Sequence, residues 1–226
     1  MKRDLTKGSI TKNIFALSLP MMLAFLLHTG FNIIDTIYVG KLSALALAAI
    51  SITFPVIFLI IALASGIGIG VTSLIARLLG AGRKRDADNA AEHSLLLALI
   101  LSIFFTTFGL TLSKPLFILI GTTPEMMPLV MDYVKIIFGG SFFMFLAFMS
   151  NSILRGEGDM KTPMKAMMLG TILNIILDPL LIFGIGIFPR LEMAGAALAT
   201  IIARSISSVF VFSHLLRNRA HIKLDL

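Results

Sequence analysis

Long apolar blocks constrain this chain more than any other feature of its sequence. The 226 residues are 57% hydrophobic and only 14% charged, with a mean hydropathy of +0.97. Each block is close to the roughly 20 residues that a membrane-spanning helix needs. Backbone polar groups inside a bilayer must find partners within the protein, and helices satisfy them within one segment. The sequence therefore predicts an all-α polytopic membrane protein without a soluble domain between the blocks.

We expect six transmembrane helices. Their predicted ranges are 13–38, 45–79, 90–112, 129–154, 164–185 and 193–216. Pro55 lies near the start of the second range and predicts a kink or an oblique entry there. Residues 1–226 are then a single transmembrane domain.

Lysine and arginine are shared unevenly between the two sides that six spans define. One side carries 14 of these residues and the other carries 4, while Arg204 falls inside the sixth span. The first group is Lys2, Arg3, Lys7, Lys12, Arg77, Arg83, Lys84, Arg85, Arg155, Lys161, Lys165, Arg217, Arg219 and Lys223, and the second is Lys41, Lys114, Lys135 and Arg190. The positive-inside rule then predicts a multi-pass protein of the cytoplasmic membrane with both termini in the cytoplasm. The net charge of +7 reflects these orientation signals rather than nucleic-acid binding.

Asp35 and Asp178 are the two acidic residues that we place at membrane depth. A carboxylate there costs on the order of 3 kcal/mol or more, so it usually faces a bundle interior and serves a proton, a metal ion or a cationic solute. Pro179 has no N–H, so the carbonyl of Ile175 loses its helical partner. Oxygens of this carbonyl, Asn174 and Asp178 suit Na⁺, and a carboxyl serves protons equally well. A simple helix kink at Pro179 is the alternative.

Three predicted spans carry polar residues at helical spacing. These stripes are His28, Asn32 and Asp35 in the first span, Thr171, Asn174 and Asp178 in the fifth, and Thr200, Arg204 and Ser207 in the sixth. Because lipid cannot satisfy polar groups, the stripes face each other or water. Hydrogen bonding between packed helices is the simpler interpretation for His28, Thr171 and Ser207. Arg204 either neutralises one carboxylate or extends toward the cytoplasm, and we favour the extension.

Composition and spacing argue against catalysis. The absence of cysteine excludes disulfides, thiol catalysis and Cys-ligated metals. The run Gly156-Glu157-Gly158-Asp159 is similar to a motif of intramembrane aspartyl proteases, but it lies in a basic loop rather than in a span. The histidines show no metal-ligand spacing. We therefore predict that the chain is not an enzyme.

Six short motifs occur in order along nearly the whole chain. They are LSLPMML, DTIYVG, LLGAGRKRDAD, LRGEGDMKTPM, NIILDPLLIFG and GAALAT. Together they resemble the multidrug and toxin extrusion (MATE) family of cation-coupled efflux transporters, and NIILDP is similar to its DNA-damage-inducible-protein-F-like branch of bacteria and archaea. The resemblance implies that this chain is the N-terminal lobe, with six helices, of a twelve-helix transporter.

The same resemblance implies roles for individual residues. The H⁺ or Na⁺ site of that branch corresponds to Asp35, Asn174, Asp178 and Thr200, with the carbonyl of Ala196 as a further ligand. Candidate cavity residues are Asn151 and Tyr133, together with Asn32 and His28 of the first stripe. The implied activity is export of organic cations and amphipathic drugs, driven by inward H⁺ or Na⁺, with no cofactor besides the coupling ion.

The chain departs from the family pattern in length, because it stops just after the sixth predicted span. Two lobes face each other in such transporters, so we expect a second six-helix lobe as partner, either a missing C-terminal half or a second copy. Membrane lipid is the other expected partner, and nucleic acid is not. A lipid-linked saccharide flippase of the same wider superfamily and a non-transporting scaffold or truncated product remain alternatives. Arg204 alone supplies few cations for a flippase substrate, and a scaffold needs no buried aspartates.

Overall fold

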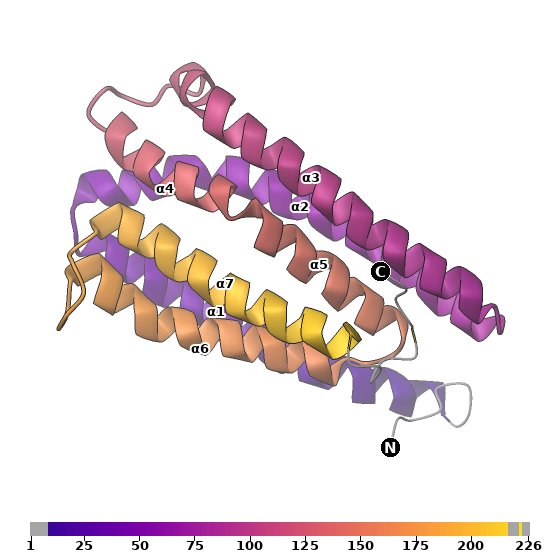
Figure 1. Cartoon of the computed structure of the whole chain (residues 1–226). Helices are drawn as coiled ribbons and strands as arrows, with labels where there is room; N and C mark the ends of the chain where they lie inside the picture. Colours follow the sequence, from indigo (N-terminus) through magenta and orange to yellow (C-terminus); the bar gives the residue numbers. More distant parts are fainter. Residues whose placement is uncertain (1–8, 217–221, 223–226) are drawn as a thin grey trace.

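The computed structural model describes residues 9–216 and Ile222, and these residues form seven α-helices (Figure 1). The helices are α1 (Ile10–Gly40), α2 (Ala44–Gly80), α3 (Lys84–Leu119), α4 (Met127–Gly139), α5 (Ser141–Gly156), α6 (Lys161–Phe183) and α7 (Glu192–Leu216). The described residues contain no strand, which confirms the all-α prediction. Six predicted basic residues, Lys2, Arg3, Lys7, Arg217, Arg219 and Lys223, lie outside the described residues.

Five of these helices, α1, α2, α3, α6 and α7, are long and apolar enough to cross a membrane. The shorter helices α4 and α5 meet the same test together, although their axes are bent by 49°. Counting the bent pair as one broken span gives six spans. The predicted range 90–112 is shorter than α3, which continues through Pro115 to Leu119, and α2 continues through Pro55 as one helix.

The helices pack in two groups with the broken span between them. Helix α6 packs against α1 and α7, while α5 contacts α2, α3 and α7, and α4 contacts α3 and α7. In Figure 1 the α2–α3 hairpin lies along one side of the bundle, and α1, α6 and α7 lie along the other. The broken span therefore joins the two groups.

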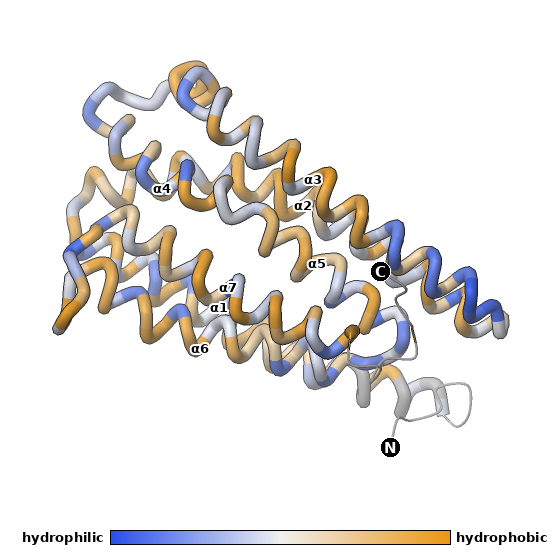
Figure 2. The backbone as a smooth tube through the Cα atoms, in the orientation of Figure 1, coloured by the Kyte–Doolittle hydropathy of each residue, from blue (hydrophilic) through white to orange (hydrophobic). Residues whose placement is uncertain are grey.

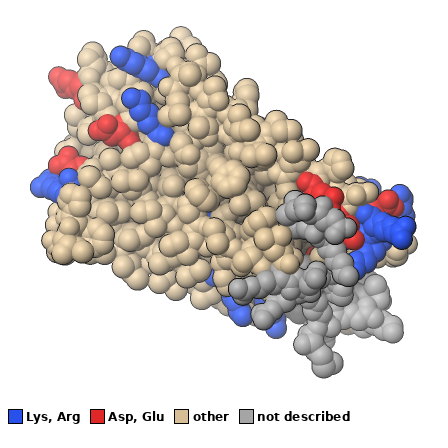
Figure 3. Space-filling view, in the orientation of Figure 1, with Lys and Arg blue, Asp and Glu red and all other residues tan. Residues whose placement is uncertain are grey.

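The two ends of the bundle differ in the turns and charges that they hold. We call one end the basic end, because the α2–α3 turn, the α5–α6 turn and their flanking turns supply Arg77, Arg83, Lys84, Arg85, Arg155, Lys161 and Lys165. The opposite end holds the α1–α2, α3–α4 and α6–α7 turns. On the face in Figure 3, charged side chains gather at these two ends and the middle is uncharged.

The α2–α3 hairpin is longer than a bilayer is thick. Helices of 37 and 36 residues measure about 55 Å at 1.5 Å per residue, whereas the hydrocarbon core is about 30 Å thick. Figure 2 shows that the far tip of this hairpin is hydrophilic. The tip therefore extends beyond the apolar layer at the basic end.

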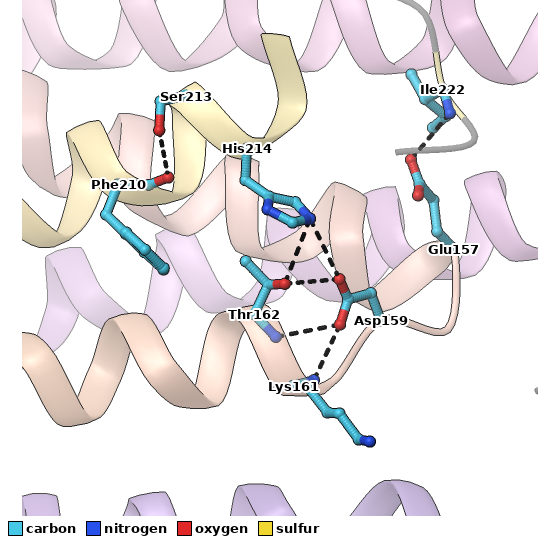
Figure 4. A network of polar contacts seen from close by, with 8 residues as sticks. All are labelled: Glu157, Asp159, Lys161, Thr162, Phe210, Ser213, His214 and Ile222. Atoms are coloured by element: carbon cyan, nitrogen blue, oxygen red, sulfur yellow. Dashed lines mark hydrogen bonds and ion pairs between the residues drawn. The ribbon is translucent and has the colours of Figure 1, made fainter. Parts of the chain in front are cut away.

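At the basic end, Asp159 links the α5–α6 turn to α7 (Figure 4). Its carboxylate accepts hydrogen bonds from the backbone N–H groups of Lys161 and Thr162, at 3.0 and 3.1 Å, and from the Thr162 hydroxyl at 2.7 Å. The Nε2 atom of His214 lies 3.7 Å from the same carboxylate. Asp159 thus caps the start of α6, a role that satisfies otherwise unpaired backbone donors.

Two apolar clusters form the interior. The large core includes Ile60, Phe117, Val134, Phe138, Phe145, Met149 and Ile182. The small core includes Ile75, Ala91, Ile153, Leu154, Ala166, Val211, Leu215 and Ile222, and it lies toward the basic end. Many large apolar side chains on the outside stay exposed, such as Phe15, Leu26 and Leu59, as expected of a surface that faces lipid.

Candidate functional site: a buried carboxyl pair

The candidate site forms where α1 packs against α6. Asp35 of α1 and Asp178 of α6 lie side by side and their side chains interact directly. Asp178 is fully buried and Asp35 is half-buried. The structure thus brings together the two carboxyl groups that the sequence places at membrane depth.

The oxygens of this pair are only partly satisfied. The amide Nδ2 of Asn174 donates to Oδ1 of Asp178 at 3.0 Å, one helical turn away. Within the part of the chain that the structure describes, Oδ1 of Asp35 and Oδ2 of Asp178 are buried and accept no hydrogen bond. Buried polar atoms normally have a partner. A proton or a small cation between the carboxyl groups would supply one.

Helices α4 and α7 add a tyrosine and a guanidinium. The charges that act on the Tyr133 hydroxyl are those of Asp35, Arg204 and Asp178. Arg204 also acts on His28 of α1. The site is therefore formed by α1 and α6, and charged and polar groups of α4 and α7 lie close enough to act on it.

Arg204 forms no direct ion pair with either carboxylate among the described residues, and its extension toward the cytoplasm stays a prediction. The ion pairs of residues 9–216 do not include it, so it does not neutralise a carboxylate directly. Its charge acts on Tyr133 of α4 and on His28 of α1.

The remaining predicted residues divide between the interior and the surface. Ala196 is buried and Thr200 is half-buried on α7, but the described hydrogen bonds join neither the Ala196 carbonyl nor the Thr200 hydroxyl to the carboxyl pair. Asn151 is half-buried on α5, and its buried Oδ1 accepts no hydrogen bond from the described residues. Thr171 is buried within the predicted stripe of α6, and Ser207 donates to the carbonyl of Ala166 at 2.7 Å. Ser207 thus links α6 and α7, as predicted.

Asn32 is exposed, whereas Asp35 of the same stripe is half-buried. Asn32 lines an open hollow with Thr29, Ile33, Thr36 and Ile37, and Thr36 donates to its carbonyl at 2.8 Å. Asn32 and Asp35 lie about one turn apart on α1, yet the packing of neighbouring helices covers part of Asp35 and leaves Asn32 exposed. The predicted role of Asn32 as a cavity residue stays a prediction.

Glycine permits the close packing that holds the site. A Cβ on Gly195 of α7 would overlap the backbone of Leu181 and Ile182 in α6, one turn beyond Asp178. The carbonyl of Leu181 also accepts a hydrogen bond from the N–H of Leu191 at 3.0 Å. Helices α6 and α7 therefore touch backbone to backbone beside the carboxyl pair.

Specific contacts also hold the break between α4 and α5. The carbonyl of Phe138 accepts hydrogen bonds from the hydroxyls of Thr106, at 3.0 Å, and Ser141, at 2.6 Å. A Cβ on Gly140 would overlap the side chain of Ile201 in α7. Contacts with α3 and α7 therefore hold the break in place. Helix α4 ends at this break and contributes Tyr133 to the site.

Comparisons with known proteins identify the family of this fold. The profile of the MatE family matches residues 20–180. A protein described as an FAD transporter in Shewanella oneidensis is 38% identical over 229 residues, which cover 99% of this chain and 51% of that protein. The probable multidrug resistance protein YoeA of Bacillus subtilis is 32% identical over 217 residues, covering 96% of this chain and 47% of that protein.

Solved structures give the same result. A transporter of the MOP superfamily from Pyrococcus furiosus superposes with a TM-score of 0.91 at 39% identity, covering 98% of this chain and 48% of that one. An outward-facing multidrug resistance transporter of the MATE family superposes with a TM-score of 0.90 at 40% identity, covering 97% and 48%. This chain spans about half the length of the relatives that it matches.

The fold is therefore that of one lobe of a multi-pass membrane transporter, a class of protein that is not enzymatic. Within that class, the chain belongs to the MatE family, as its motifs indicated.

Proposed function

We propose that this chain is the lobe of a MATE transporter that holds the cation-coupling site. The direct contact between Asp35 and Asp178, each with one buried and unpaired oxygen, is the observation that carries this proposal. Two neighbouring carboxylates in a weakly polar surrounding repel each other, so a proton or Na⁺ stabilises the pair. Occupancy changes the charge where α1 meets α6, and this change favours one arrangement of the helices over another.

The oxygen atoms of the carboxyl pair suit H⁺. They also suit Na⁺ when further oxygen ligands join them. A proton needs only the carboxyl pair. Na⁺ prefers several oxygen ligands, and Asn174 lies next to the pair, while the hydroxyl of Thr200 and the carbonyl of Ala196 would be the additional ligands.

We further propose that the basic end faces the cytoplasm and that a second six-helix lobe completes the transport path. The positive-inside rule supports the orientation. The half-length match to relatives supports the second lobe. Organic cations and amphipathic drugs are the proposed substrates, since relatives such as YoeA and the multidrug export protein MepA of Staphylococcus aureus are described as multidrug proteins.

Arg204 favours a second candidate substrate class, molecules that carry a phosphate. Its guanidinium lies inside the lobe without a carboxylate partner among the described ion pairs. Guanidinium groups bind phosphate oxygens through paired hydrogen bonds. A relative that is 38% identical is described as an FAD transporter, and FAD contains a pyrophosphate.

Efflux of ethidium from cells tests the coupling proposal. The chain is joined to the second half of a MATE relative, and an inward H⁺ or Na⁺ gradient is imposed. Asp178→Asn and Asp35→Asn should each reduce efflux at least tenfold, because an amide cannot gain and lose charge. Asp132→Asn, the same change at an exposed position of α4, serves as the matched control and should transport normally. Full efflux by both buried variants would refute the coupling site.

The same fusion of this chain to the second half of a MATE relative distinguishes the two proposed substrate classes. FAD and ethidium are compared as cargo, with Arg204→Gln as the variant. If the cargo carries phosphate, FAD transport should fall at least tenfold more than ethidium transport, because a change in ion coupling affects both cargoes alike. If the fusion transports ethidium but not FAD, the phosphate-carrying class is refuted and drug export remains as the proposal.

A further inference from the structure

The turn between α5 and α6 contacts the end of α7 through a histidine. His214 lies in the last turn of α7. Its Nε2 atom lies 3.7 Å from Oδ2 of Asp159 and 3.5 Å from the hydroxyl oxygen of Thr162. In Figure 4 the ring points toward both oxygen atoms. The side chains of His214 and Asp159 are only 24% and 14% exposed, so the start of α6 and the end of α7 meet at a partly buried polar contact.

Asp159 is held in place by its own turn. The N–H groups of Gly158 and Asp159 donate to carbonyls at the end of α5, each at 2.9 Å. Gly158 has a φ of 82°, a left-handed conformation that favours glycine where a helix ends. The Asp159 carboxylate accepts three hydrogen bonds from the start of α6, two from backbone N–H groups and one from the Thr162 hydroxyl. His214 therefore meets an acceptor whose position does not depend on the histidine.

The hydrogen bonds assign a proton to Nε2 of His214. The Thr162 hydroxyl donates to Oδ2 of Asp159 at 2.7 Å, and a hydroxyl has one proton to donate. The Thr162 oxygen can therefore only accept from the imidazole ring. The neutral and the charged ring can both donate from Nε2, but only the charged ring adds a Coulomb attraction to Asp159.

The two helix ends favour opposite charges at this contact. Asp159 lies at the start of α6, where the helix dipole stabilises an anion, and His214 lies near the end of α7, where the dipole stabilises a cation. Histidine is the side chain that ordinarily changes its charge between about pH 5 and pH 8. The attraction is therefore fully present at the acidic end of this range, and it is lost as the pH rises and the ring loses its charge.

Other charged groups do not replace Asp159 as the partner of His214. In Figure 4 the Lys161 side chain extends away from the ring, and Glu157 points toward Ile222, whose N–H donates to it at 3.0 Å. The helices packed against α7 also carry Lys12 and Asp35 on α1, Asp132 and Lys135 on α4, Arg155 on α5, and Lys165 and Asp178 on α6.

These further charges are distant, engaged elsewhere or outside the described part. Asp178 lies about 25 Å farther along α6 at 1.5 Å per residue, and Asp35 lies beside it. The two charged residues of α4 precede the helix break, on the side away from the basic end. Arg155 donates to Ser152 at 3.0 Å, and Lys165 is exposed. The side chain of Lys12 and the residues Arg217, Arg219 and His221 lie outside the described part of the chain.

We propose that the α5–α6 turn is a pH-sensitive clasp for α7, in which protonated His214 binds Asp159 and Thr162. Loss of the proton removes the ion pair and weakens the hold of the turn on the end of α7. The clasp does not depend on the proposed transport function. Because α6 carries Asp178 and α7 carries Arg204, the clasp determines how firmly one end of this helix pair is held.

A double-mutant cycle in the unfolding of the purified 226-residue chain tests the clasp. His214→Gln cannot become charged, and Asp159→Asn loses its charge but can still cap α6. At about pH 5.5 the unfolding equilibrium constant of the double variant should be about threefold smaller than the two single effects predict, because both changes remove one ion pair. At about pH 8 this factor should fall toward one. Effects that combine independently at both pH values, or a factor that is equal at both, would overturn the proposal.

His93→Gln is the matched control for this cycle. His93 is exposed on α3, and its ring nitrogen Nδ1 lies 2.8 Å from the carbonyl of Asn89 in the same helix. Combined with Asp159→Asn, this change should show no coupling at either pH. Coupling as large as that of His214 would assign the effect to the overall charge of the chain and overturn the clasp.

Amide hydrogen exchange tests where the clasp acts. After correction for the intrinsic pH dependence of exchange, the amides of residues 212–216 in the wild-type chain should be protected about fivefold more at about pH 5.5 than at about pH 8. His214→Gln should abolish this difference and His93→Gln should keep it. Equal protection of the wild-type chain at both pH values would refute a clasp that depends on the charge of His214. Neither measurement requires transport, so a failure here is distinct from a failure of the coupling site.

Discussion

Adding one methyl group to Gly195 should loosen the contact between α6 and α7 beside the candidate site. Its Cβ would lie 2.6 Å from the carbonyl carbon of Leu181 and 2.9 Å from the backbone nitrogen of Ile182. These neighbours are backbone atoms, which cannot rotate away as a side-chain tip can. Ordinary van der Waals contact begins near 3.4 Å, so the helices must separate locally by about 0.8 Å.

The expected loss follows from two opposing effects. Overpacking of a close contact costs about 1–3 kcal/mol, while alanine is favoured over glycine within a helix by about 0.5–1 kcal/mol. The Gly195→Ala variant should therefore lose about 1–2 kcal/mol. For a chain of this size, 1 kcal/mol shifts the melting temperature by about 2–4 °C, so the variant should melt about 2–8 °C lower.

Thermal unfolding of the purified chain in detergent measures this loss. Gly66→Ala is the matched control, because it makes the same change within α2 and nothing lies within 4 Å of the added atom. That variant should melt at or slightly above the wild-type temperature. If Gly195→Ala melts as high as Gly66→Ala, the backbone contact between α6 and α7 is not as close as the structure shows.

Three further outcomes are expected. Thr106→Val removes the hydroxyl that bonds the Phe138 carbonyl and should lower the free energy of unfolding in denaturant by about 1 kcal/mol. An unchanged free energy would contradict the role of this hydrogen bond at the break between α4 and α5. Asp159→Ala removes the cap of α6 and should lower the free energy of unfolding by about 1 kcal/mol. Asp159→Asn keeps a side-chain oxygen that can accept the same hydrogen bonds, so it should lose much less stability. Reporter fusions after Arg85 should indicate the cytoplasm and those at Arg190 the exterior; the reverse would overturn the proposed orientation.

The sequence predicts the layout of the lobe well because membrane burial leaves a strong pattern. Apolar blocks of spanning length indicate helices, and intramembrane carboxyl groups indicate a functional interior. The contact of Asp35 with Asp178 follows from the same reasoning, since polar groups on two apolar helices need one another.

The break between α4 and α5 could not be predicted in this way. The pair Gly139-Gly140, followed by Ser141, lies within an otherwise apolar run. Glycine pairs often mark helix bends, a local signal that the pattern of apolar blocks does not use. The bend depends on tertiary contacts, namely the Thr106 hydroxyl on the Phe138 carbonyl and the packing of Ile201 against Gly140. The exposure of Asn32 and the position of Arg204 likewise depend on how neighbouring helices pack.

The charges inside the lobe predict how many coupling ions it binds. Asp35 and Asp178 are adjacent, and the only cation described near them is Arg204, which acts on the same tyrosine. With both carboxyl groups ionised, this cluster carries one net negative charge, and burying a net charge is costly. One H⁺ or Na⁺ makes the cluster neutral, and a second would leave it positive. Titration of the purified chain should therefore show one coupling ion per lobe, and Arg204→Gln should raise that number to two. Two ions in the wild-type chain would refute this charge balance.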